Sequence, residues 1–91
     1  MKSIIQSRKE CYVCGTPFNI HEHHVYGSAN RKNSEKYGLK IYLCAYHHNM
    51  SDEGIHFNKD LDLAVKENAQ RIFEKTHTRE EFMSIFGKNF L

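Results

Sequence analysis

Two pairs of potential metal ligands with the same internal spacing carry the first recognisable chemistry in this sequence. Two residues separate Cys11 from Cys14, and two residues separate Cys44 from His47. Two ligands at this spacing can hold one ion from a tight turn, and two such turns complete the tetrahedral coordination of Zn²⁺. Gly15 suits the first turn, because glycine tolerates positive φ and lets backbone N–H groups point at the sulfurs. We predict a structural Zn²⁺ bound by Cys11, Cys14, Cys44 and His47.

The cysteines permit two other interpretations. They could be small buried hydrophobic residues that lie near His47 by chance, or Cys11 and Cys14 could form a redox pair of the thioredoxin type. The redox interpretation requires a preceding strand and helix and leaves the second pair unexplained. The odd number of cysteines, three, argues against a closed disulfide framework. The zinc site is the interpretation that accounts for both pairs.

Histidines form the second chemical signal, because six of the seven lie between residues 21 and 56. His23 and His24 are adjacent in a predicted strand, where successive side chains point to opposite faces. One of them can therefore bind a divalent ion while the other, as a neutral imidazole, accepts a proton from water. Such an arrangement suits metal-assisted hydrolysis of a phosphodiester bond.

Two further histidines could converge on the same ion. His48 directly follows the second zinc half-site, and His56 lies eight residues later. The zinc site would bring this part of the chain close to His23, so all three imidazoles are candidate ligands of the catalytic metal. His21 and His77 have no comparable partners, and we expect both to be solvated side chains.

In chain order, these features are a CxxC pair, His-His in a strand, a loop, a second strand, and CxxH followed by His at a helix start. This order resembles the HNH, or ββα-metal (His-Me finger), endonuclease family, above all its small zinc-stapled members, many of which are carried by bacteriophages. The resemblance covers residues 11–57. It implies that His24 is the general base, that His23 and His48 bind a catalytic ion, with Mg²⁺ or Mn²⁺ expected, and that the substrate is DNA.

Two positions depart from the family pattern. The middle Asn of the family would fall at Gly38, and Asn30 or Asn33 could take over its role of fixing the loop and orienting the base. The last metal ligand of the family would fall at Asp52, with His56 further along the chain. We favour His56 as this ligand.

Positive charge follows the His-His strand directly. Arg31 and Lys32 come first, and Lys36 is close behind. This order places cations beside the proposed metal, where a phosphate backbone must lie, although a solvated polar loop would have the same composition. No long helix with paired Arg and Asn on one face is evident. We therefore expect Arg31 and Lys32 to contact DNA phosphates, with weak sequence preference.

The strands and helices predicted around these residues make a small α+β domain. We predict a strand over residues 20–26 and, from the alternation of apolar and polar residues, a half-buried strand over residues 39–43. Residues 27–36 are rich in Gly, Ser, Asn, Arg and Lys and predict a loop. Residues 44–50 predict the start of a helix.

The last third of the sequence predicts two packing helices. Apolar residues recur at spacings of three and four over residues 61–73, which is one face of an amphipathic helix that we expect to pack on the core. Thr78 and Glu81 form a capping box for a second helix, which Gly87 ends. The predicted fold is a ββα-metal finger over residues 11–57, stapled by zinc, with a helical tail over residues 58–91.

Composition sets the outer limits. The chain has 91 residues, 40% of them hydrophobic, and a net charge of +2, which describes one domain with a small core, residues 1–91. No apolar run approaches the ~18 residues of a membrane span, and the start lacks the apolar region of a secretory signal. We expect a cytoplasmic protein without a membrane partner, in the host cell if it is phage-encoded. No dimer seam is visible, so we expect a monomer, with a dimer as the alternative.

The leading hypothesis is a metal-dependent DNA endonuclease in which a histidine base activates water beside one divalent ion. The alternative, of a different class, is a zinc-stapled nucleic-acid-binding module without catalytic activity. A purely structural zinc domain within a larger assembly is a third possibility, and it predicts neither cleavage nor DNA binding.

Overall fold

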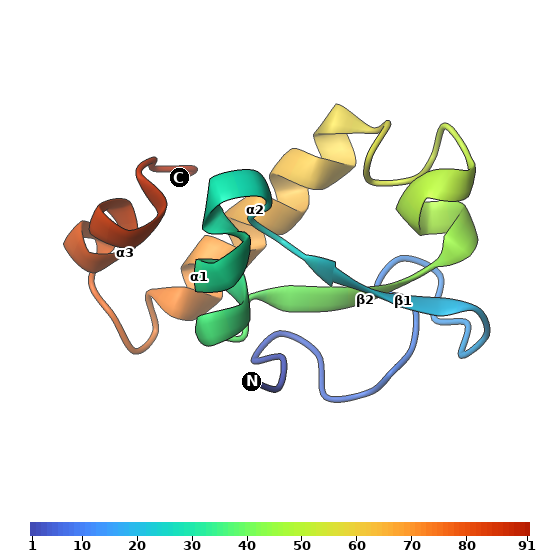
Figure 1. Cartoon of the computed structure of the whole chain (residues 1–91), viewed down its shortest axis with the longest axis horizontal. Coiled ribbons are helices and arrows are strands. Elements are labelled where there is room, and N and C mark those ends of the chain that lie inside the picture. Colours follow the sequence, from blue (N-terminus) through green and yellow to red (C-terminus); the bar gives the residue numbers. More distant parts are fainter.

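A two-stranded antiparallel sheet lies at the centre of the computed structural model, which describes residues 1–91 (Figure 1). Strand β1 (Ile20–His24) pairs with β2 (Lys40–Cys44). A short turn of 3-10 helix, η1 (Ser28–Asn30), and helix α1 (Arg31–Lys36) connect them. One wide, π-type turn, η2 (Tyr46–Met50), follows β2. The α+β class and both predicted strands are confirmed, although β1 ends at His24 instead of residue 26.

Two helices complete the chain, as predicted. They are α2 (Lys59–Phe73) and α3 (Arg79–Phe86). Thr78 and Glu81 form the predicted capping box, and Gly87 ends α3 in the left-handed conformation. Turn η2 and α3 lie at opposite ends of the sheet (Figure 1).

The connection over residues 27–36 is helical, so the predicted loop is wrong. Its helix buries a polar residue: Ser34 is fully buried, and its hydroxyl accepts from the Tyr26 N–H and donates to the Leu39 carbonyl. The Asn30 and Asn33 amides donate to the carbonyls of Phe86 and Ile85, at 3.0 and 3.3 Å. Because polar side chains hold this helix in place, no apolar periodicity in the sequence signals it.

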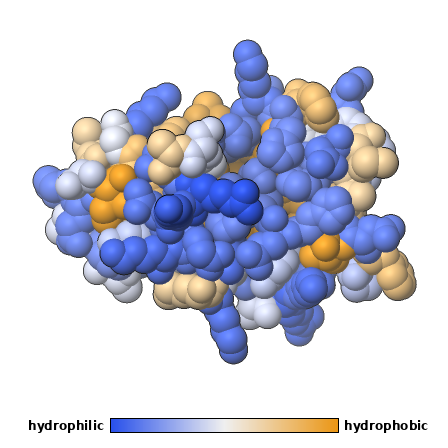
Figure 2. Space-filling view, in the orientation of Figure 1, coloured by the Kyte–Doolittle hydropathy of each residue, from blue (hydrophilic) through white to orange (hydrophobic).

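The hydrophobic core joins the sheet to the C-terminal helices. Leu39, Ile41 and Leu43 are fully buried, and they belong to one cluster with residues of α2 and α3, namely Val65, Ala69, Phe73, Phe82 and Phe86. The predicted packing of the stripe at 61–73 on the core is confirmed. The face of the molecule in Figure 2 is mostly hydrophilic, with scattered apolar groups. None of the helices has the length and apolar character needed to cross a membrane.

The pairing register decides which side chains share a face of the sheet. His21 pairs with Leu43, and His23 pairs with Ile41, so both histidines lie on the face that carries the core. Glu22 and His24 lie on the opposite face. As predicted, the two adjacent histidines point in opposite directions.

Candidate active site and metal centres

Three cysteines and one histidine meet where the N-terminal turn approaches the end of β2. The Cys14 and Cys44 sulfurs are 3.8 Å apart, and His47 Nδ1 lies 3.3 Å from Cys44 Sγ and 3.7 Å from Cys11 Sγ. A tetrahedral ion with metal–sulfur bonds of ~2.3 Å spaces its sulfur ligands about 3.8 Å apart. All three cysteines are free thiols. The four predicted residues therefore lie close together and could hold one metal ion.

The turn that carries the first two cysteines has the backbone that such a site needs. Gly15 has φ of +77°, as expected, and its N–H bonds to the Cys11 carbonyl at 2.8 Å. The Cys14 N–H points at Cys11 Sγ, at 3.5 Å. Burial acts to raise the pKa of the Cys11 thiol, but backbone N–H groups of Cys44, Cys14 and Val13 outweigh it and lower this pKa to about 6. These N–H groups thus favour the thiolate of Cys11, which is the form that binds metal, whereas the nearby Cys11 and Cys44 sulfurs raise the pKa of Cys14.

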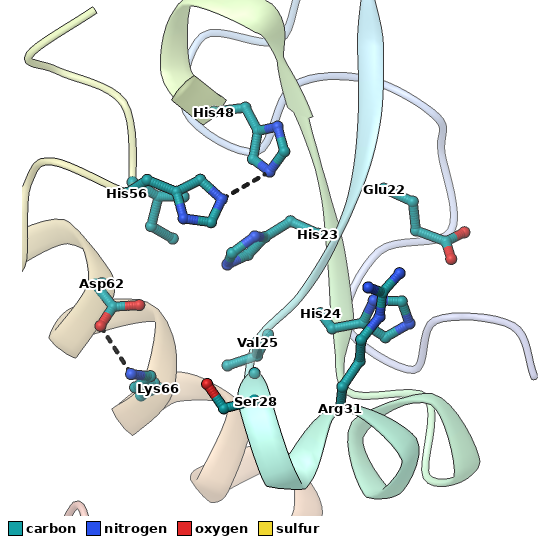
Figure 3. Close-up of a pocket in the computed structure, with 12 residues that line it drawn as sticks. Glu22, His23, His24, Val25, Ser28, Arg31, His48, His56, Asp62 and Lys66 are labelled. Atoms are coloured by element: carbon teal, nitrogen blue, oxygen red, sulfur yellow. Dashed lines mark hydrogen bonds and ion pairs between the residues drawn. The ribbon is translucent and has the colours of Figure 1, made fainter. Parts of the chain in front are cut away.

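Three imidazoles form a second cluster on the core face of β1 (Figure 3). The His23 ring lies 5.4 Å from His48 and 5.2 Å from His56, centroid to centroid, and the Nε2 atoms of His48 and His56 are 3.0 Å apart. His23 is 8% exposed, and its Nε2 is buried without a hydrogen-bond partner. A buried nitrogen without a partner is costly unless something binds it.

The electrostatics of this cluster favour neutral imidazoles. Burial, followed by the proximity of His48 and His56, lowers the pKa of His23 to about 4. Burial, followed by His56 and His21, also lowers the pKa of His48. Neutral imidazole is the form that donates a lone pair to a metal ion. The orphaned nitrogen and the three-imidazole donor set therefore fit a divalent metal ion.

The chain reversal after η2 brings His56 to this cluster. The N–H groups of Ile55 and His56 bond to the carbonyls of His47 and His48, at 2.8 and 3.3 Å. Of the two residues considered for the last ligand position, His56 lies beside His48, whereas Asp52 is exposed and belongs to no cluster of metal-ligating side chains.

His24 lies in a network of charged side chains on the other face of β1. Its Nε2 is 3.0 Å from Glu35 Oε1, and Lys40, its partner across the sheet, contacts Glu35 at 3.0 Å and Glu22 at 3.2 Å. The Met1 ammonium, His24 and Lys40 together hold the pKa of Glu35 well below its usual range. Glu35 is therefore a carboxylate that faces the proposed base.

The carboxylates of Glu22 and Glu35 and the imidazole of His24 are close enough together to hold a metal ion of their own. The Lys40 ammonium already contacts both carboxylates, so it supplies the positive charge that a metal ion would otherwise provide there. Sequence reasoning missed Glu35, because it lies in the segment predicted as a loop.

An open hollow of about 610 Å³ connects the two faces of β1 at the end of the strand. It is lined by His23, His24, His48, His56, Arg31, Asp62 and Lys66, among others (Figure 3). Arg31 reaches it from α1, whereas Lys32, which is also exposed, does not line it. Asp62 and Lys66, paired at 2.8 Å, reach it from α2. The helical tail therefore contributes to the hollow, which sequence reasoning did not predict.

Two histidines expected to be solvated are not. His21 Nδ1 lies 2.9 Å from His48 Nδ1, and the His77 ring stacks on Phe73 with centroids 4.2 Å apart. For His21 the sequence did hold a signal, since strand alternation places it on the same face as His23. For His77 no such signal existed, because the contact depends on the turn between α2 and α3.

No protein-family model, curated protein or solved structure matches this chain. The chemistry of the site therefore has to be read from its own geometry.

Gly54→Ala is expected to separate His56 from His48. A Cβ at this position would lie 2.8 Å from the His48 carbonyl oxygen and 3.0 Å from that of Ser51, so the turn must open. We expect a loss of ~1–3 kcal/mol in urea unfolding and shifted ring signals of both histidines in NMR spectra. Gly27→Ala is the control, because its Cβ would meet nothing within 4 Å. Equal behaviour of the two variants would contradict this account of the turn.

Proposed function

We propose that this chain is a metal-dependent DNA endonuclease with a ββα-metal site. One observation carries the proposal: His23, whose Nε2 is buried without a partner, shares a cluster with His48 and His56, while the neighbouring His24 contacts a carboxylate on the other face of the strand. A metal-binding imidazole and a candidate base are thus adjacent and separate, and both line one hollow. This is the arrangement that metal-assisted phosphodiester hydrolysis requires.

The cluster of Cys11, Cys14, Cys44 and His47 is proposed to bind structural Zn²⁺. Three thiolates and one imidazole form a donor set typical of closed structural zinc sites. The core cluster contains only 13 buried residues, so a metal staple would contribute a large share of the stability.

His23, His48 and His56 are proposed to bind the catalytic ion. A divalent ion bound there would supply positive charge to the scissile phosphate and to the leaving oxygen. Mg²⁺ prefers oxygen ligands, whereas imidazole suits later transition ions. The three-imidazole donor set therefore suits a transition ion later than Mn²⁺ better than it suits Mg²⁺, and Mn²⁺, the other ion expected from the sequence, would bind more weakly than these later ions.

His24 is proposed to accept the proton of the attacking water. Its Nε2–H would donate to Glu35, which leaves the Nδ1 lone pair as the base. The ionised carboxylate also stabilises the imidazolium that forms. Glu35 would thus fix the tautomer and orientation of His24.

Cations on the rim of the hollow are proposed to contact DNA phosphates. Arg31 and His24 both line the hollow (Figure 3), and Lys32, which is exposed, follows Arg31 in α1 outside the lining. Phosphate contacts position the duplex without reading its sequence.

One site of this kind cuts one strand, so a monomer would nick DNA. A linear product without a nicked intermediate would instead indicate a dimer.

The inactive nucleic-acid-binding module remains the second candidate, and one observation favours it. Asn30 and Asn33 are both engaged with carbonyls of α3, so neither orients His24 as the family Asn would. On this alternative, the chain retards supercoiled plasmid in a gel but produces no nicked form with Mn²⁺ or Mg²⁺. Nicked product supports the endonuclease.

His24→Ala and His23→Ala are expected to differ in plasmid nicking. His24→Ala removes the base and should lower the rate by ~10²–10⁴-fold at any metal concentration. His23→Ala weakens binding of the catalytic ion, so a higher Mn²⁺ concentration should partly restore the nicking rate. His48→Ala should behave in the same way. Both effects are measured as rate against Mn²⁺ concentration. Cleavage by His24→Ala at the wild-type rate would exclude His24 as the base.

Glu35→Gln is expected to slow nicking without weakening DNA or Mn²⁺ binding. A hydrogen bond to a charged group contributes about 1.5–3 kcal/mol, which corresponds to roughly 10- to 100-fold in rate. Glu22→Gln is the matched control, because Glu22 shares the contact with Lys40 but makes no hydrogen bond to His24. Equal rates for the two variants would show that Glu35 does not act through His24.

Cys14→Ser is expected to cause loss of the bound metal and unfolding. Cys14 is exposed, so as a mere packing residue it would tolerate serine, whereas a ligand of structural Zn²⁺ contributes to a binding free energy of ~10 kcal/mol or more. Val13→Ser, an exposed change in the same turn, is the control. Metal content and circular dichroism provide the measurement, and a folded Cys14→Ser variant with one Zn²⁺ would refute the site.

A further inference from the structure

His21 is a partly buried histidine that the proposed mechanism does not use. It lies two residues before His23 in β1, on the same face of the sheet, and its ring meets the edge of His48 at 85° with centroids 5.0 Å apart. Its Nδ1 is 2.9 Å from His48 Nδ1, which is a hydrogen-bond distance. Two ring nitrogens at this distance require one to donate and the other to accept.

His48 has different neighbours at its two ring nitrogens. Nδ1 faces His21, and Nε2 faces His56 at 3.0 Å. A neutral imidazole carries one N–H. If that proton lies on Nδ1, it is donated to His21, and the Nε2 lone pair is free beside His23 and His56. If it lies on Nε2, His48 presents a proton where a metal ligand needs a lone pair.

We propose that His21 is a positioning residue for the metal site: its Nδ1 accepts the Nδ1–H of His48 and so holds the His48 Nε2 lone pair toward His23 and His56. The inference rests on the proposed function in one respect, since it assumes that these three imidazoles bind a divalent ion. Outer partners of metal-bound imidazoles fix the tautomer and ring orientation, and their loss costs ~10–100-fold in metal affinity. His21 thereby gains a role in metal affinity and none in proton transfer.

The first test is Mn²⁺ binding by the full chain, followed through the EPR signal of free Mn²⁺. Mn²⁺ binds most weakly in the first-row divalent series and suits harder ligands than thiolate, so it leaves the thiolate cluster, which is Cys11, Cys14, Cys44 and His47, undisturbed. His21→Phe keeps a ring but lacks the acceptor, and it should raise the Kd about 10–100-fold. His21→Gln, which offers an acceptor oxygen, should recover most of the affinity. His77→Phe, a histidine change outside the cluster, should leave the Kd unchanged.

Two outcomes distinguish this inference from the proposed function. If His23→Ala binds as much Mn²⁺ as the wild-type chain does, the metal site itself is wrong. If His23→Ala does abolish binding but His21→Phe binds as tightly as the wild type, the role of His21 is overturned and the metal site stands.

A second measurement does not depend on the variants or on added metal. Long-range ¹H–¹⁵N spectra of the wild-type chain report which ring nitrogen of His48 carries the proton. A proton on Nδ1 supports the inference, and a proton on Nε2 overturns it. This readout also decides the case if His21→Phe fails to fold.

Discussion

Convergence of four donor atoms at the end of β2 is the constraint on which both candidate centres depend. Cys11 and Cys14 come from the N-terminal turn, and Cys44 and His47 come from the last residue of β2 and from η2. The backbone of the N-terminal turn adds a hydrogen bond to β2, from the Tyr12 N–H to the Tyr42 carbonyl, at 2.7 Å. Thiolates this close together repel one another unless a cation lies among them, so a bound metal would hold these segments together.

The position of η2 then determines the second centre. His47 belongs to the thiolate cluster, and the next residue, His48, belongs to the imidazole cluster. The wide turn places two adjacent side chains in two different sites, and the backbone bonds of Ile55 and His56 to this turn complete the second one. Loss of the first centre would therefore disturb the second, although the two share no ligand.

Strand β1 separates two environments with opposite electrostatics. On the core face, His23 is buried among imidazoles, and low exposure favours its neutral form. On the other face, His24 lies beside the carboxylate of Glu35 and the ammonium of Lys40. The proposed metal ligand and the proposed base need these different surroundings, and strand alternation provides both within two residues.

Residue types, their spacing and their alternation are local properties, and these were predictable before the fold was known. Ligand pairs with a fixed local spacing predicted the thiolate cluster, and the period of a strand predicted that His23 and His24 diverge, because both properties depend on neighbours a few residues away. The apolar stripe of α2 and the capping box of α3 were predictable for the same reason.

Contacts between segments that are distant in sequence could be established only from the folded chain. Glu35 reaches His24 because polar side chains hold α1 against the sheet and α3, and α1 has no apolar periodicity to reveal it. His56 joins His48 because the chain reverses tightly at Gly54, and Asp62 and Lys66 line the hollow because the core packs α2 beside it. These contacts arise from packing and long-range hydrogen bonds, which no local pattern in the sequence encodes.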